Sequence, residues 1–138
     1  MTLIVDTGGL LSVLDANQDD HEDFVTALDL IPGPRIVSSL VITELDHLVL
    51  DRYGRAAELS VMQEVEEAYQ IAAFGNEDMD RALLTRYADL RSFDLADATC
   101  VVLAERYDCF DILTTDVRDF RNITGSRVRH FRLIPYDL

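Results

Sequence analysis

The sequence predicts an α/β fold, a three-layer α/β/α sandwich around a central, mostly parallel sheet of about five short strands. Short apolar runs alternate along the chain with segments whose apolar residues recur at helical spacing, and glycine, proline or serine lies between many of them. Strands that alternate with helices form βαβ units, which make the strands parallel and cover both faces of the sheet. No repeat or linker interrupts this pattern, so residues 1–138 are expected to form a single domain.

The first half of the chain supplies three of the expected strands. Leu3–Val5 is a continuous apolar run typical of a buried parallel strand, and Gly8 and Gly9 allow a sharp turn into a helix that runs to about Asn17. The other expected elements are a helix over 19–30, a strand over 35–37, a helix capped by Ser38 or Ser39 and ending at Tyr53, a helix over 55–68, and a strand over 70–74.

The second half continues the alternation. A helix is expected from Gly75 and Asn76 to about Arg91, and a second one, opened by Asp94 and apolar almost all round from Ala96 to Ala104, follows it. Strands are expected over 112–115 and 131–134.

Composition is that of an ordinary globular protein, with 49% hydrophobic and 28% charged residues. No apolar run approaches the roughly 20 residues of a membrane span, and the N-terminal residues lack the basic region of a signal peptide. We therefore expect a cytoplasmic protein with no membrane partner. Cys100 and Cys109 lie in or beside apolar sequence and are expected to be buried free thiols, while cysteine and histidine are too scattered for a structural zinc site.

The net charge of −14 argues against a simple basic nucleic-acid binder. All 12 basic residues are arginine, however, which suits the planar recognition of phosphate better than lysine does. Part of the negative charge can also belong to a cation site. Composition alone leaves the partner open.

Acidic residues recur where the expected strands end and the following helices begin. Asp6 and Asp116 follow apolar strands, Glu44 lies near the start of a helix, and Asp97 lies in the first turn of another. In an open parallel sheet, ligands bind outside the carboxyl ends of the strands. If the first strand and the 112–115 strand are neighbours, these four carboxylates can converge on one point.

Carboxylate oxygens select hard cations, so the pattern predicts Mg²⁺ or Mn²⁺ rather than zinc. Such a site suits the hydrolysis of a phosphodiester by a metal-activated water, and Thr7, Thr114 and Thr115 supply hydroxyls nearby. Simpler roles stay open for several of the acids: Asp94 as a helix cap, Asp97 as a complement to the helix dipole, and Asp119 as a turn residue.

Four motifs in a fixed order resemble the PIN domain family, and within it the VapC-type toxins of type II toxin–antitoxin systems. They are IVDTGGLL, VITEL, LADA and ILTTDVRDF, and together they span nearly the whole chain. No single motif is specific, whereas the ordered set is. The resemblance implies a PIN-like fold and an endoribonuclease dependent on Mg²⁺ or Mn²⁺.

The resemblance also implies residue roles and partners. The catalytic, metal-binding quartet falls on Asp6, Glu44, Asp97 and Asp116, and auxiliary roles fall on Asp94, Asp119, Thr7 and Thr115. An RNA substrate (tRNA, rRNA or mRNA), a cognate antitoxin and a homodimer are expected, with Arg118 and Arg121 guiding the RNA. The family often has serine where this chain has Gly8, which removes one hydroxyl from the first turn.

Two alternative functions stay open. One is a PIN-like RNA-processing nuclease outside any toxin pair, and the other is a catalytically silent PIN-like module that only binds proteins. A di-iron site built on Glu44 and His47 is disfavoured because no second such pair is present. A phosphatase of another α/β fold would need a second aspartate two residues after Asp6, where Gly8 stands.

Overall fold

The computed structural model describes residues 2–88, 94–123 and 130–138, and in these ranges it contains five strands and seven helices. In chain order the elements are β1 (Leu3–Val5), α1 (Thr7–Leu14), α2 (His21–Leu30), β2 (Arg35–Ser38), α3 (Ser39–Tyr53), α4 (Arg55–Ala68), β3 (Gln70–Ala72), α5 (Asn76–Ala88), α6 (Leu95–Arg106), β4 (Asp111–Leu113), α7 (Val117–Arg121) and β5 (Arg132–Ile134).

The strands form one sheet in the order β3-β2-β1-β4-β5, and every pairing in it is parallel. β1 is the middle strand; Ile4 is in register with Ile36 of β2 on one side and with Ile112 of β4 on the other. All three residues of β1 and all three of β4 are buried. The predicted α/β class is confirmed, and β1 and β4 are neighbours as the site hypothesis requires.

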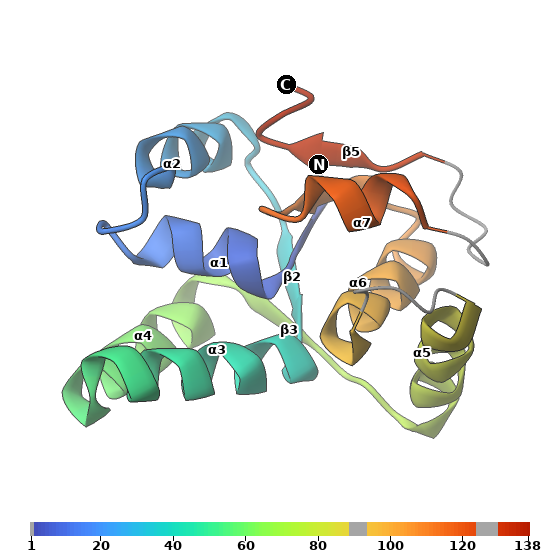
Figure 1. The fold of residues 1–138 in the computed structure, drawn as a ribbon, viewed down its shortest axis with the longest axis horizontal. Helices are drawn as coiled ribbons and strands as arrows, with labels where there is room; N and C mark the ends of the chain where they lie inside the picture. Colours follow the sequence, from blue (N-terminus) through green and yellow to red (C-terminus); the bar gives the residue numbers. More distant parts are fainter. Residues whose placement is uncertain (1, 89–93, 124–129) are drawn as a thin grey trace.

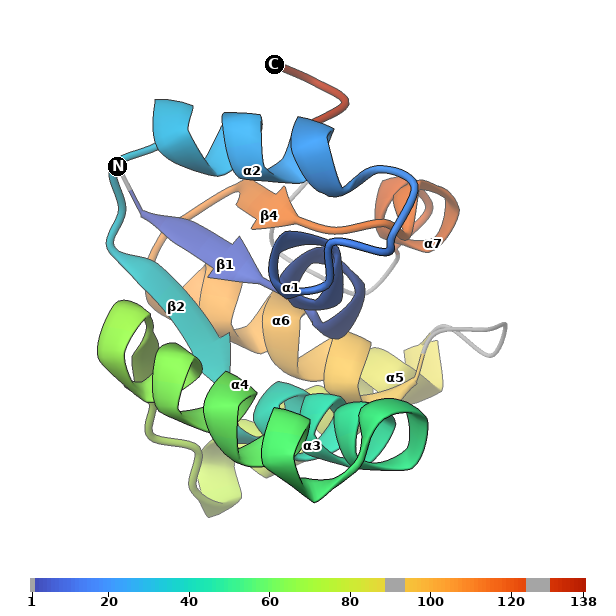
Figure 2. The ribbon, with the colours of Figure 1, turned by 90° about the vertical axis from the view of Figure 1, so that its left-hand side faces the viewer.

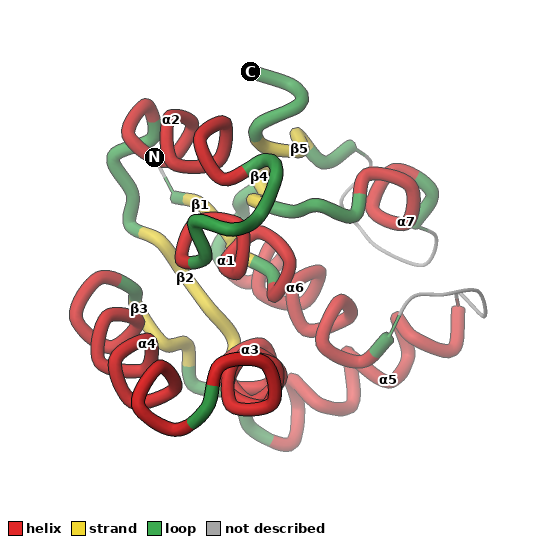
Figure 3. The backbone as a smooth tube through the Cα atoms, turned by 60° about the vertical axis from the view of Figure 1, so that its left-hand side comes forward, coloured by secondary structure: helices red, strands yellow, loops and turns green. Residues whose placement is uncertain are grey.

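Helices cover the sheet on both sides. In Figure 1, α1 and α2 lie on one side of β1 and β2, and α6 and α5 lie on the other. The helix α3 packs against α1, α4 and α6, and Figures 2 and 3 show strands enclosed by helices. Eight of the twelve residues of α6 are buried, as its apolar sequence predicts. None of the helices in the described part of the chain is long and apolar enough to cross a membrane.

Several predicted boundaries are wrong by a few residues. α1 ends at Leu14 rather than Asn17, because Asp15 leaves the helical conformation and accepts hydrogen bonds from the Asn17 backbone (2.9 Å) and the Tyr53 hydroxyl (2.6 Å). β3 ends at Ala72, and β4 ends at Leu113. The end of the helix predicted to reach Arg91 lies outside the described residues.

The helix α7 is absent from the sequence-based prediction. It has five residues, too few for a periodic apolar pattern, and it begins because the Asp116 side chain accepts a hydrogen bond from the Asp119 backbone N–H at 3.1 Å. Asp116, predicted to follow the strand directly, is separated from β4 by Thr114 and Thr115 and is the N-cap of α7.

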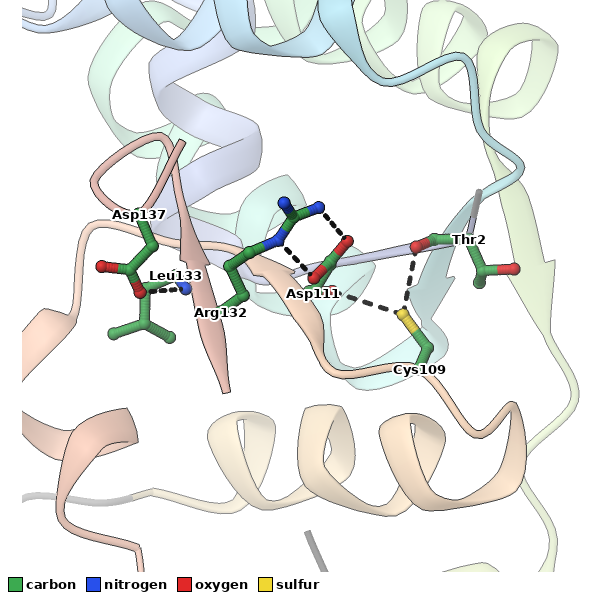
Figure 4. A network of polar contacts seen from close by, with 6 residues as sticks. All are labelled: Thr2, Cys109, Asp111, Arg132, Leu133 and Asp137. Atoms are coloured by element: carbon green, nitrogen blue, oxygen red, sulfur yellow. Dashed lines mark hydrogen bonds and ion pairs between the residues drawn. The ribbon is translucent and has the colours of Figure 1, made fainter. Parts of the chain in front are cut away.

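A polar network joins the first residue of β4 to the first residue of β5 (Figure 4). Arg132 donates two hydrogen bonds to the Asp111 carboxylate, at 2.8 and 2.7 Å, and these residues are direct register partners. The buried Cys109 thiol donates to the Thr2 carbonyl at 3.1 Å, which ties the start of β4 to the start of β1. Both cysteines are free and buried, as predicted.

The first turn of α1 approaches the end of β4 very closely. A Cβ atom added to Gly9 would lie 2.2 Å from the Leu113 carbonyl oxygen, which already accepts a hydrogen bond from the Asp6 N–H at 3.1 Å. Glycine at this position therefore lets α1 begin directly above β4.

Substituting Gly9→Ala should destabilise the protein by ~3 kcal/mol or more, because the obstructing atom belongs to the backbone and cannot rotate away. Chemical denaturation measures the effect. Gly75→Ala is the matched control: its added Cβ meets nothing within 4 Å, so a change within ~0.5 kcal/mol is expected. Equal stability of the two variants would refute the close approach of α1 to β4.

Candidate functional site

Four acidic residues from four elements lie at the carboxyl edge of the sheet. Asp6 follows β1 and is only 3% exposed, while Glu44, Asp97 and Asp116 are half-buried on α3, at the start of α6 and at the start of α7. The helices α1, α3 and α7 begin there because each follows, directly or through a short connection, a strand that ends at that edge. The sequence-based prediction of an acidic edge is thus consistent with the topology.

The buried Asp6 carboxylate is held by two hydrogen bonds. One oxygen accepts from the Gly9 backbone N–H at 2.7 Å and so caps α1; the other accepts from the Thr114 hydroxyl. The same Thr114 oxygen accepts from the Asp116 backbone N–H at 2.8 Å. One buried hydroxyl therefore connects the ends of β1 and β4 and fixes two of the four acids relative to each other.

Asp97 is held from its own helix. Asp94 accepts from the Asp97 N–H at 2.8 Å and Asp97 accepts from the Asp94 N–H at 3.2 Å, which makes a capping box at the start of α6. The proposed capping role of Asp94 is confirmed.

A second buried link positions α6 against α3, the helix of Glu44. Ser38 caps α3 by accepting from the Val41 N–H, and its hydroxyl lies 2.7 Å from the Thr99 hydroxyl of α6. The Thr99 hydroxyl donates to the Ala96 carbonyl, so the Ser38 hydroxyl donates to Thr99. Both side chains are fully buried, which fixes the two helix starts side by side.

Burial, and to a lesser extent the charge of neighbouring carboxylates, raises the pKa of three of these acids. Burial raises the pKa of Asp6 to about 7, against the hydrogen bonds from Thr114 and Gly9, and the negative charges of Asp116 and Glu44 add to the rise. Burial raises the pKa of Asp97 to about 8, with the charge of Asp94 as the next cause and a contribution from Asp6. Burial, then the neighbouring Asp119, raises the pKa of Asp116. The folded chain therefore disfavours the charged forms of Asp6, Asp97 and Asp116 at this edge of the sheet.

A divalent cation would relieve this repulsion, and oxygen-only donors suit a hard one. The present arrangement is not a closed ligand cage: within residues 2–88, 94–123 and 130–138, no three acidic, histidine or cysteine side chains lie close enough together to hold one ion. The residues fit a cation in donor chemistry and charge.

The hydroxyls of the site differ from the prediction in one respect. Thr115, expected beside the last quartet member, is exposed, whereas Thr114 is fully buried and bonded to Asp6. Thr115 instead lies against Gly8, where an added Cβ would be 2.2 Å from its hydroxyl oxygen. The Thr7 hydroxyl is buried with no hydrogen-bond partner among the described residues. The sequence carries no signal that separates Thr114 from Thr115, because β4 ends at Leu113 and all three of its residues are buried, so no alternation of buried and exposed side chains extends to the two threonines.

The two arginines expected to guide RNA lie on α7. Arg118 is exposed, and its carbonyl accepts a hydrogen bond from Asn122. Arg121 pairs with Asp137 of the C-terminal segment at 2.5 Å, which gives it a structural contact that the sequence did not indicate. Asp119 is buried in α7.

Substituting Thr114→Val should cost ~1–3 kcal/mol of stability, because it leaves the Asp6 carboxylate and the Asp116 N–H without their shared partner. Urea denaturation measures this. Thr115→Val, an exposed neighbour, should change stability by less than ~0.5 kcal/mol. The assignment of Thr114 fails if the order of the two effects is reversed.

The raised pKa values of Asp6 and Asp97 predict that, in EDTA, the free energy of unfolding falls as pH rises from about 4 to 8. The folded chain keeps protons in this window that the unfolded chain has released, so a rise in pH favours unfolding. Asp97→Asn should therefore be stabilising relative to the original chain, by an amount that grows by at least ~1 kcal/mol between pH 5 and pH 8. Asp51→Asn, an exposed acid of α3, is the control and should show no growth.

Comparison of the sequence with known proteins identifies the family to which the chain is similar. The model of the PIN domain family matches residues 3–125. Ribonuclease VapC26 of Mycobacterium tuberculosis (strain ATCC 25618 / H37Rv) is 40% identical over 139 residues, which cover 96% of this chain and 100% of the relative. Ribonuclease VapC1 of Aquifex aeolicus (strain VF5) is 26% identical over 117 residues, covering 83% of this chain and 81% of that protein.

Two solved structures share the fold. The Mycobacterium tuberculosis VapC20 structure, described as a sarcin-ricin loop cleaving toxin, aligns with a TM-score of 0.73 at 19% identity, over 85% of this chain and 92% of its own. The VapBC2 structure from Rickettsia felis, bound to a DNA fragment from its promoter, aligns with a TM-score of 0.70 at 15% identity, over 96% of this chain and 97% of the matched chain. At these identities the two matches establish the architecture alone.

Proposed function

The chain belongs to the PIN domain family, and from this premise we propose that it is a VapC-type endoribonuclease, the toxin of a type II toxin–antitoxin pair. The observation that carries the proposal is the gathering of Asp6, Glu44, Asp97 and Asp116 at one edge of the sheet, in a chain related over nearly its full length to a ribonuclease. A silent binding module would have no need of acids whose burial, together with the charge of their neighbours, raises their pKa values.

The four acids share one part in the proposed reaction. Asp6, Glu44, Asp97 and Asp116 would move closer together to hold a divalent cation, Mg²⁺ or Mn²⁺, since no three of them lie close enough to hold one ion in the described structure. When bound, such a cation lowers the pKa of a water and stabilises the charge that develops on the phosphate. Thr114 holds Asp6 and Asp116 in place by its two hydrogen bonds, and Asp94 holds Asp97 through the capping box. Arg118, exposed on α7, would contact the RNA backbone.

An antitoxin and a second copy of the chain are the proposed protein partners. The VapBC2 structure, named as a complex of the two components, supports the first. The strong negative charge of this chain favours an antitoxin segment that carries basic residues. The homodimer stays a prediction, which sedimentation of the purified chain tests.

Purified protein should cleave RNA only when Mg²⁺ or Mn²⁺ is present, and Asp6→Asn or Asp116→Asn should lower the rate by about 100-fold or more, because each removes a charge that would hold the ion. Gel analysis of total tRNA and rRNA measures cleavage. Asp51→Asn, remote from the edge, is the matched control and should keep full activity. Cleavage that survives EDTA would contradict the proposal.

The silent-module alternative is tested by metal binding in the same samples. Millimolar Mn²⁺ should raise the melting temperature of the original chain, because the ion binds only the assembled carboxylates, and should have little effect on Asp6→Asn. A module without a metal site would show equal melting temperatures with and without Mn²⁺ in both proteins.

A further inference from the structure

A groove between α2 and the C-terminal segment has no part in the site described so far. It encloses about 320 Å³, close to the lower end of the range for small-ligand pockets. Phe24, Ala27 and Leu30 of α2 and Tyr136 of the C-terminal segment give it apolar walls, and the acidic side chains of Asp20 and Asp23 also line it. Figures 1 and 2 show the C-terminal segment passing beside α2.

The groove presents an aromatic ring that is fixed yet open. Tyr136 packs edge-on against the buried Phe24, with ring centroids 6.2 Å apart and an interplanar angle of 80°. The residue is nevertheless 49% exposed, and Leu30 beside it is 67% exposed. A ring held in one orientation, with half its surface accessible, is suited to stacking on a flat ligand at low entropic cost.

The groove lies close to the acidic edge. Tyr136 follows β5, which is parallel to β4 and ends on the same side of the sheet. Burial raises the pKa of the Tyr136 hydroxyl, and the charges of Asp20, Asp6 and Asp23 add to the rise, which agrees with this placement beside the acidic edge. A polymer bound at the acidic edge can therefore place a neighbouring unit in the groove.

The charge of Asp20 and Asp23 determines which part of such a polymer the groove can bind. Asp20 is the N-cap residue of α2 but makes no capping hydrogen bond, and neither its side chain nor that of Asp23 has a hydrogen bond or ion pair with the other described residues. Carboxylates repel phosphate and accept hydrogen bonds from amino groups. Single-stranded RNA is commonly recognised by aromatic stacking together with contacts to base edges.

We propose that this groove is a nucleobase subsite, in which an unpaired base that carries an exocyclic amino group stacks on Tyr136 and donates to Asp20 or Asp23. The proposal rests on the ribonuclease function proposed above and adds a specificity element to it. Adenine, cytosine and guanine carry such an amino group and are favoured, whereas uracil lacks one and is disfavoured.

The chain has no tryptophan, so Tyr136→Trp introduces a single fluorescent indole at the groove. In an Asp97→Asn background, which suppresses cleavage, oligo(A) and oligo(C) hexaribonucleotides should quench this fluorescence at concentrations at least about tenfold lower than oligo(U). A fluorescence change produced by an arginine- and leucine-containing peptide, with no response to any oligonucleotide, would overturn the proposal in favour of a protein ligand.

Cleavage kinetics with matched variants complete the test. Tyr136→Ala should raise KM for an adenine-containing substrate by about tenfold with kcat retained, and Tyr136→Phe should keep the KM of the original chain. Tyr87→Ala on α5 removes a comparably exposed aromatic (67%) and should change neither constant. RNA cleavage with an unchanged KM in Tyr136→Ala overturns the subsite alone. Base-dependent quenching without any cleavage by the original chain supports the subsite and refutes the ribonuclease proposal.

Discussion

The burial of the Asp6 carboxylate at the end of the central strand is the constraint on which the rest of the site depends. The close approach of Gly9 to Leu113 brings the start of α1 over the end of β4, and the Asp6 carboxylate there accepts hydrogen bonds from the Gly9 N–H and the Thr114 hydroxyl. These two hydrogen bonds do not compensate for the carboxylate's loss of hydration, because the pKa of Asp6 still rises to about 7. A fold that keeps such a group is less stable at neutral pH than it could be, which is expected where a charge is retained for function.

Helix capping explains how the fold tolerates the other acids. Asp6 caps α1, Asp94 and Asp97 together cap α6, and Asp116 caps α7. Each carboxylate is stabilised by backbone N–H groups at the positive end of a helix. The capping role seen in the structure and the proposed metal-binding role are therefore compatible, because a capping carboxylate keeps its charge at the edge of the sheet where the helix begins.

Much of this arrangement could be predicted from the sequence, because strong local patterns specify it. An apolar run followed by an aspartate predicted the position of β1 correctly and that of β4 to within two residues. The apolar sequence from Ala96 to Ala104 predicted a buried α6. The role of Thr114 could not be separated from that of Thr115, since it depends on which face of the chain meets α1. The groove at Tyr136 joins segments about a hundred residues apart, and no local pattern reports such a contact.

The claim that the carboxylates at this edge share excess charge that a cation relieves is tested most directly by their own titration. Carbon-13 NMR of the aspartate carboxyl groups, recorded against pH in EDTA, should show Asp6 titrating near 7 and Asp97 near 8, and addition of Mg²⁺ should lower both pKa values. Ordinary aspartate titrations near pH 4, unchanged by Mg²⁺, would contradict the account.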